Sequence, residues 1–193
     1  MANTEKNVDA RIRRSREALI KAGRELLNQN YETSLSDIAR QAGVGRTTLY
    51  RLFETKQELV TAIALDCLQI FDRATAHIDA EADSALDAIR LLYRAIMPLS
   101  AEMQFLMNLS DLDCEDPELV RLFERQENEM RELIELAKHE GSIDKALPTD
   151  WLLHAIDALF YPAWMLRGRK EYSDDSLAEL AFRGFCQGAA RRS

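Results

Sequence analysis

Residues 34–53 read SLSDIARQAGVGRTTLYRLF, two short segments with helix-spaced apolar residues on either side of a glycine. The first segment should begin at Ser34, because Ser34 and Asp37 have the spacing of a capping box. Gly43 supplies the backbone freedom that a tight turn requires. The side chains available to pack the two segments together are Ile38, Ala39, Val44, Leu49 and Leu52. This arrangement predicts a helix-turn-helix.

The second short helix, expected over residues 46–53, carries polar and basic side chains on its free face. In such a motif the N-terminal part of this helix enters a DNA major groove. Arg46 has the chemistry to contact guanine O6 and N7, and Thr47 can touch a thymine methyl group. Thr48 and Tyr50 carry hydroxyls suited to phosphate oxygens, with Arg51 nearby. The alternative is that these residues form an ordinary solvated helix face.

At these positions the sequence resembles the TetR (tetracycline-repressor) family of transcriptional regulators. The resemblance extends over residues 14–63 and includes Ala42-Gly43-Val44, Thr48-Leu49-Tyr50 and Lys56-x-Glu58-Leu59. Gly45 stands where a serine is common and Thr47 where a glycine is common, which bears on operator preference rather than on class. The resemblance implies base or backbone contacts from Arg46, Thr47, Thr48 and Tyr50, and phosphate contacts from Thr33, Ser34 and Lys56.

The rest of the chain is predicted to be helical, giving an all-α fold. It holds only four valines and few alternating apolar stretches, whereas apolar residues at helical spacing recur throughout. In the first helix they are Val8, Ile12, Ser15, Leu19, Ala22 and Leu26. We expect helices over about 9–28, 34–41, 46–53, from 56 onward, 84–97, 102–109, from Pro117 to Gly141, 149–166 and 174–192. The predicted domains are a DNA-binding head, 1–57, and a helical body, 58–193.

Charge is distributed unevenly between these two parts. Residues 1–60 carry 11 Lys and Arg against 8 Asp and Glu, a net charge of +3, while the remainder carries 14 against 25, a net charge of −11. This asymmetry favours contact of the head alone with a polyanion. The sequence has neither an apolar run long enough for a membrane span nor a secretory leader, which predicts a cytoplasmic protein without a membrane partner. Cys67, Cys114 and Cys186 are predicted to be reduced.

The last two predicted helices carry small residues that would permit close helix approach, namely Ala155, Ala163, Ala178, Ala181, Gly184 and Gly188. The TetR resemblance implies that such helices form the interface of a homodimer. Two recognition helices about 34–36 Å apart would then bind the two halves of a palindromic operator. The alternative is that the small residues serve packing within one chain.

The body also contains Met and aromatic residues that could line a pocket for an unidentified small-molecule effector. His154, Asp157 and Tyr161 share a helix face and could orient such a molecule. The candidate ligand-binding residues are Tyr93, Met97, Phe105, Met107, Phe123, Trp151, His154, Asp157, Tyr161 and Trp164. Residues of these types at helical spacing also form ordinary cores. A ligand that prefers the form with wrongly spaced heads would release DNA.

Two other functions fit an all-α chain. A helical-bundle enzyme would need paired Glu-x-x-His motifs for a di-metal site, and the three histidines, His77, His139 and His154, do not provide them. No catalytic residues, metal ligands or cofactor are therefore predicted, and we expect a protein that is not an enzyme. A DNA-independent adapter of the same fold is the remaining alternative.

Overall fold

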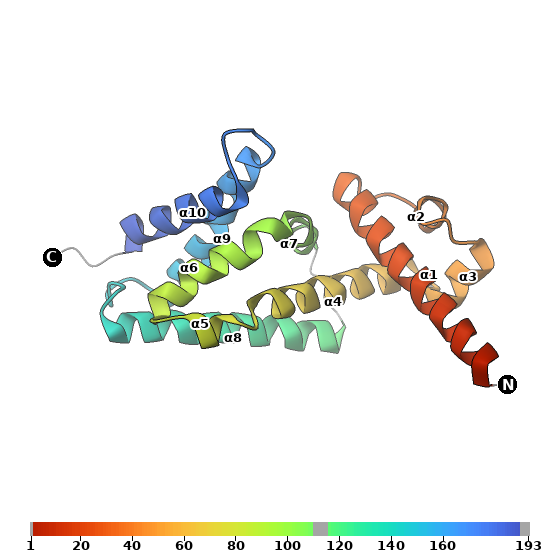
Figure 1. The fold of residues 1–193 in the computed structure, drawn as a ribbon, viewed down its shortest axis with the longest axis horizontal. Coiled ribbons are helices and arrows are strands. Elements are labelled where there is room, and N and C mark those ends of the chain that lie inside the picture. The colour runs from red at the N-terminus through yellow and green to blue at the C-terminus, as the bar shows by residue number, and fades with distance from the viewer. Residues whose placement is uncertain (1, 110–115, 190–193) are drawn as a thin grey trace. The chain divides into compact units, whose positions relative to one another are not determined.

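The computed structural model describes residues 2–109 and 116–189, with side chains described from residue 9 to residue 188 inside those ranges. Every regular element in this part of the chain is a helix, which confirms the all-α prediction (Figure 1). Packing divides the chain into two compact units. The first comprises residues 1–69 and 101–120, and the second comprises residues 70–100 and 121–193. The predicted domain boundary after residue 57 falls inside the first unit, and it stays a prediction.

The first unit is built on α1 (Ala2–Gln29), α2 (Leu35–Gln41), α3 (Arg46–Leu52) and the first part of α4 (Lys56–Thr75). It also contains α7 (Ser100–Met107) from Ala101 onward and the first turn of α8 (Pro117–Glu140). Its core contains the fully buried Leu19, Ile38, Leu49, Leu59 and Ile63. α1 and α4 approach closely at Gly23, where an added Cβ would lie 2.8 Å from Ile63 Cδ1.

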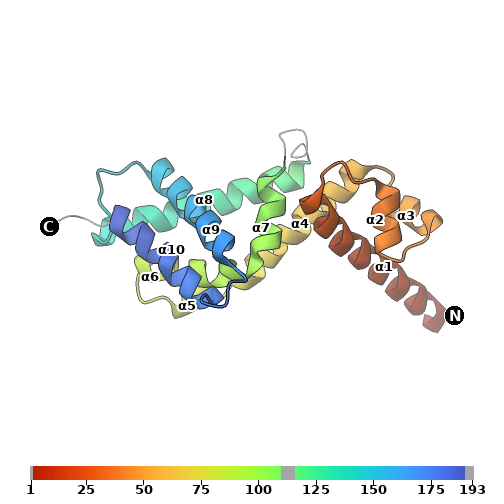
Figure 2. The ribbon, with the colours of Figure 1, turned by 90° about the horizontal axis from the view of Figure 1, so that it is seen from above.

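The second unit contains the end of α4, α5 (Ile78–Glu81), α6 (Ala85–Ile96), the 3-10 helix η1 (Met97–Leu99) and most of α8. It also contains α9 (Thr149–Leu166) and α10 (Asp174–Ala189). α10 packs against both α9 and α6 (Figure 2). Leu152, Ile156 and Phe160 of α9 and Leu177 and Ala178 of α10 are buried at this junction.

Helix ends follow the capping residues in the sequence. Asp116 Oδ1 accepts from the backbone N of Glu118 and Leu119 at 2.9 and 3.0 Å, which begins α8 at Pro117. Ser84 caps α6 in the same way, and Ser173 Oγ accepts from Ser176 N at 3.1 Å before α10. Gly141 ends α8 with a φ of +83°, a conformation that favours glycine.

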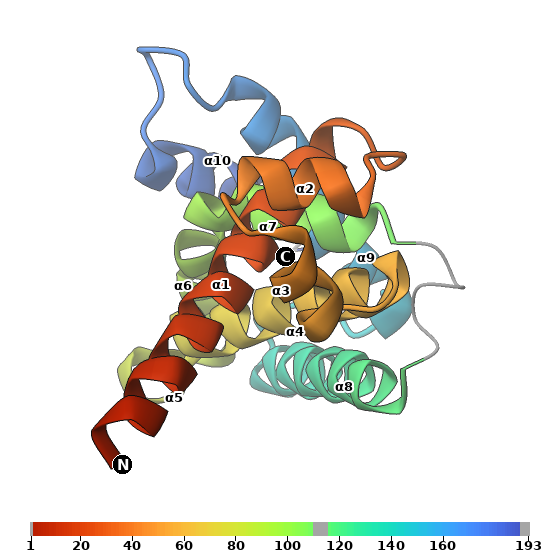
Figure 3. The same ribbon diagram turned by 90° about the vertical axis from the view of Figure 1, so that its right-hand side faces the viewer.

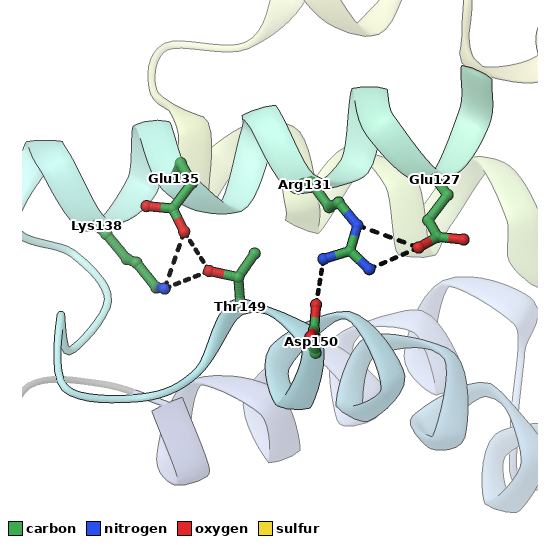
Figure 4. A network of polar contacts seen from close by, with 6 residues as sticks. All are labelled: Glu127, Arg131, Glu135, Lys138, Thr149 and Asp150. Atoms are coloured by element: carbon green, nitrogen blue, oxygen red, sulfur yellow. Dashed lines mark hydrogen bonds and ion pairs between the residues drawn. The ribbon is translucent and has the colours of Figure 1, made fainter. Parts of the chain in front are cut away.

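The end of α8 is fastened to the start of α9 by a polar network (Figure 4). Arg131 pairs with Glu127 at 2.6 Å and also with Asp150. Lys138 Nζ donates to Glu135 Oε1 at 3.0 Å and to Thr149 Oγ1 at 2.5 Å. Lys138 is buried, so these two acceptors satisfy a cation that would otherwise be costly to remove from water.

Tyr93 fills the centre of the second unit. Its hydroxyl donates to the Ile156 carbonyl at 3.1 Å, and its ring lies 4.8 Å from the Phe160 ring, centroid to centroid. Burial raises the pKa of Tyr93, so the hydroxyl stays a neutral donor. Replacing Tyr93 with Phe keeps the ring contact and removes one buried hydrogen bond. We expect a loss of about 1 kcal/mol in the free energy of unfolding, measurable by urea denaturation, whereas an unchanged midpoint would contradict the role of this bond.

The described cysteines are free: Cys67 is fully buried and Cys186 is partly exposed. Cys114 lies outside the described residues. In the part of the chain that the structure describes, no helix combines the length and apolar character needed to cross a bilayer.

Candidate nucleic-acid interface

The turn between α2 and α3 has the geometry that its sequence predicts. Gly43 adopts a φ of +65°, and its N donates to the Arg40 carbonyl at 3.2 Å. Val44 N donates to the Ala39 carbonyl at 2.9 Å, and Ala39 is buried. A side chain at Gly43 would be strained, because L-residues rarely adopt this conformation. The turn therefore fixes the angle at which α3 leaves α2 (Figure 3).

α3 has one buried face and one face in water. Leu49 is fully buried and Phe53, at the end of the helix, is almost so. Arg46, Thr47, Tyr50 and Arg51 are exposed, with 48% of Tyr50 accessible, and Thr48 is partly exposed. Four side chains able to bind bases or phosphates are thus exposed on a short helix that Leu49 and Phe53 anchor. This is the arrangement needed for insertion into a groove.

Ser36 belongs to the same surface and was missed by sequence reasoning. The Arg46 guanidinium lies 3.5 Å from Ser36 Oγ, from α3 to α2. Nothing in the spacing of Ser36 distinguishes it from an ordinary first-turn serine, so only the tertiary structure identifies it as a neighbour of Arg46. Arg16 of α1 lies over the Phe53 ring, 5.6 Å from the centroid.

Two of the predicted phosphate-binding hydroxyls are engaged within the protein. Thr33 Oγ1 donates to the Asn30 carbonyl at 2.7 Å. Ser34 Oγ donates to Asp37 Oδ2 at 2.6 Å and accepts from Asp37 N at 3.2 Å, so the predicted cap of α2 is present. This hydrogen bond from Ser34, together with the charge of Arg40, lowers the pKa of Asp37. Either hydroxyl would have to exchange its acceptor to donate to a phosphate.

Lys56 is likewise engaged, at the start of α4. Its ammonium donates to the Tyr31 carbonyl and lies 4.6 Å from the centroid of the Tyr31 ring. Beside it, Glu58 N donates to Thr55 Oγ1 at 3.1 Å and Glu54 N donates to Glu58 Oε2 at 2.8 Å. Thr55 and Glu58 thus cap the N-terminus of α4. Lys56, the first residue of α4, lies at this N-terminus, where backbone amides favour a phosphate.

The candidate ligand-binding residues are distributed over both units. Tyr93, Met97 and Phe105 are buried, and Trp164 Nε1 donates to the Met97 carbonyl at 3.2 Å. Phe105 and Met107 belong to the first unit, while the other members of the set belong to the second. Phe123 is partly buried and Met107 is exposed. The members on one side of α9, Trp151, His154, Asp157 and Tyr161, are all exposed.

A surface cleft of about 340 Å³ lies between α1 and α4 in the first unit, and basic side chains dominate its lining. The lining residues are Arg13, Arg16, Glu17, Ile20, Lys21, Arg24 and Asp66. Within the described ranges, no group of three or more His, Cys, Asp and Glu side chains is placed to hold a metal ion.

Sequence comparison places the helix-turn-helix among known regulators. Residues 19–63 match the model of the family described as bacterial regulatory proteins, tetR family. The helix-turn-helix-type transcriptional regulator YxbF of Bacillus subtilis (strain 168) is 40% identical over 75 residues, which are 37% of this chain and 20% of YxbF. The repressor LfrR of Mycolicibacterium smegmatis is 26% identical over 127 residues, 66% of this chain and 67% of LfrR.

Solved structures share the fold along nearly the whole chain. The ketosteroid transcriptional regulator KstR2 of Mycobacterium tuberculosis aligns with a TM-score of 0.77 and 16% identity over 92% of this chain and 95% of its own. LfrR from Mycobacterium smegmatis, solved in complex with proflavine, aligns with a TM-score of 0.73 and 20% identity over 93% of this chain and 98% of its own. The helical body therefore has the fold of TetR-like regulators as well as the head.

Proposed function

Because the chain belongs to the TetR family of bacterial regulatory proteins, we propose that it is a transcriptional repressor that binds a palindromic operator as a homodimer and leaves it when a small molecule binds. The observation that carries this proposal is the exposure of Arg46, Thr47, Tyr50 and Arg51 on α3, a helix that the buried Leu49 anchors. The protein would act in the cytoplasm and would not be an enzyme.

In this proposal the side chains divide into two groups. Arg46 and Thr47 contact base edges, because they lie in the first turn of α3. Thr48, Tyr50 and Arg51 contact the backbone on either side of the groove, and Thr33, Ser34 and Lys56 supply further phosphate contacts. Thr33 and Ser34 must each redirect the one hydroxyl hydrogen that they donate within the protein, whereas the Lys56 ammonium has two further donors beside the one that it gives to the Tyr31 carbonyl.

The exposed face of α9 supports the homodimer. Trp151, His154, Ala158, Tyr161 and Met165 are all exposed and, at 100° per residue, fall on one side of the helix. The exposed fractions of Trp151, Tyr161 and Met165 are 68%, 60% and 63%. Large aromatic and Met side chains at such exposure are typical of a surface that a partner covers.

Two of the small residues of α10 are buried within one protomer. Ala178 and Ala181 of α10 are buried within the chain, so packing inside one protomer accounts for them. Gly184 is exposed, and an added Cβ there would lie 3.4 Å from Leu159 of α9. We therefore propose that α10 supports α9 from within the protomer and that α9 supplies the apolar contacts between protomers.

The operator can be found by in vitro selection of random duplexes on the full chain, followed by fluorescence anisotropy with the selected DNA. We expect an inverted repeat bound by two protomers, with half-sites about 34–36 Å apart or somewhat more. Failure to enrich any duplex would contradict the proposal and favour the DNA-independent adapter.

Release by a small molecule is tested with the selected duplex and a defined probe. Proflavine is the first choice, because LfrR, a relative by sequence, binds it in its solved structure. We expect proflavine to raise the operator dissociation constant, with a response that saturates as a protein site fills. Because proflavine also binds DNA, a second DNA-binding protein on its own site is the control, and equal release of both would contradict an effector site in this chain.

Lys56 provides a separate test of phosphate binding. Replacing Lys56 with Met should reduce the slope of log affinity against log salt by about 0.9 per protomer, since one phosphate contact is lost. The same change removes the contact with Tyr31 and should lower the melting temperature. A lower melting temperature with an unchanged salt slope would show that Lys56 only holds Tyr31.

A further inference from the structure

A charged cluster that the proposed DNA contacts do not use lies where α1, α4 and α7 meet in the first unit. The Arg24 guanidinium pairs with Asp66 Oδ2 at 3.2 Å and with Glu102 Oε1 at 3.0 Å. The side chains of Arg24 and Glu102 are only 15% and 13% exposed. Burial of the thiol beside them raises the pKa of Cys67 to about 12, so the local charge is that of the guanidinium and the two carboxylates.

A second contact joins α1 and α7. Asn28 Nδ2 donates to the Ala101 carbonyl at 2.8 Å. Arg24 and Asn28 are four residues apart and so share one face of α1, toward the first turn of α7. Asn28 Oδ1 is buried and, within the described residues, has no hydrogen-bond partner, which is a cost of holding the amide in this position.

Stability alone is a poor reason for such a cluster. Largely buried ion pairs seldom outperform apolar side chains of the same volume, because desolvation offsets the attraction. A planar guanidinium that reaches two carboxylates from different helices does, however, fix the helices in one arrangement. Arg24 is thus suited to set the orientation of α1 relative to α4 and α7, and α1 carries the helix-turn-helix that packs on it.

The chain continues from this cluster directly into the second unit. Ser100, the residue before Ala101, accepts in the second unit from Arg167 NH1 at 2.5 Å. Arg167 also pairs with Asp174, the first residue of α10, at 2.9 Å. Of the three consecutive residues 100–102, Ser100 contacts Arg167 in the α9–α10 connection. Ala101 and Glu102 contact Asn28 and Arg24 of α1. Each contact lies inside one unit, and the covalent chain joins them.

We propose that Arg24 is a positioning residue: its pairing with Asp66 and Glu102 holds α1 in the orientation that operator binding requires, and displacement of residues 100–102 releases it. This inference rests on the proposed function. It identifies Glu102 as the carboxylate whose loss should lower operator affinity without any change in the DNA-contacting residues.

Glu102→Gln is the first test, because it removes the charge and keeps the side-chain volume. If only about one tenth of the dimers then hold both heads in the competent orientation, operator affinity falls about tenfold. The matched control is Arg125→Gln, which breaks the 2.6 Å pair with Asp72 in the second unit and should leave operator affinity unchanged. Anisotropy is measured well below the melting temperature of every variant, as determined by circular dichroism.

Arg24→Lys keeps the protein testable if Glu102→Gln folds poorly. Lysine keeps the charge but not the fork that reaches both carboxylates, so operator affinity should fall while Asp66 stays compensated. Combining Arg24→Lys with Glu102→Gln should cost less than the sum of the two single losses in binding free energy, because both act on one contact. Lower stability with unchanged operator affinity, or fully additive losses, would overturn the inference. If the wild-type chain enriches no duplex in the selection, the proposed function itself is contradicted.

Discussion

The double substitution Trp151→Glu with Tyr161→Glu is expected to convert the dimer to monomers. Both side chains are more than half exposed in the protomer and would be buried between two copies of α9. Large aromatic anchors of an interface contribute about 2 kcal/mol or more each, and two are lost from each protomer. Glutamates would also bring like charges together across the two-fold axis. Dimerisation should therefore weaken by more than about a thousandfold.

Operator affinity should fall with the dimer, because each monomer then holds a single half-site. Loss of the second binding event costs about a hundredfold or more in apparent affinity. Leu136→Glu is the matched control, since Leu136 is 50% exposed and lies on another helix, α8. Light scattering at micromolar concentration measures the mass. A dimer mass that persists in the double variant would place the interface elsewhere.

Arg46→Ala should produce the other large effect, on DNA recognition itself. A base contact from an arginine contributes about 1–3 kcal/mol per half-site, and the dimer has two half-sites. We expect a loss of at least about tenfold in operator affinity, with relaxed selection at one position of each half-site. The fold should be unaffected, because Arg46 is exposed and its hydrogen bond to Ser36 is long, at 3.5 Å.

Arg40→Ala is the control for the loss of one positive charge. Arg40 is exposed on α2 and pairs with Asp37, and it lies outside the predicted reading face. It should weaken binding slightly and equally for every duplex. Repeating the selection with Arg46→Ala separates the two effects. An unchanged consensus sequence would show that Arg46 does not contact a base.

Local features of this fold could be predicted from the sequence because they depend on neighbours along the chain. The cap at Ser34 and Asp37, the positive φ at Gly43 and the start of α8 at Pro117 are all present. The bounds of α9, residues 149–166, also agree with the prediction. Side-chain assignments were less accurate toward the end of α1, where Leu27 rather than Leu26 is buried. The helical period allows either choice there, and packing on α2 and α4 decides it.

The residues alone thus determined the helix-turn-helix, its exposed polar residues and the order of the longer helices, since propensity, capping and apolar period act over a few positions. The break between α4 and α5, after Thr75, was not predicted. Tertiary structure decided which other element of the chain packs against each side of a helix. Trp151 and Tyr161 have the spacing expected of a pocket lining, and both are exposed in the single protomer. Arg24, one of several basic residues of α1, meets Glu102, which lies 78 positions later. Helical period assigns a residue to a side of its helix, whereas the element lying against that side depends on how the whole chain packs.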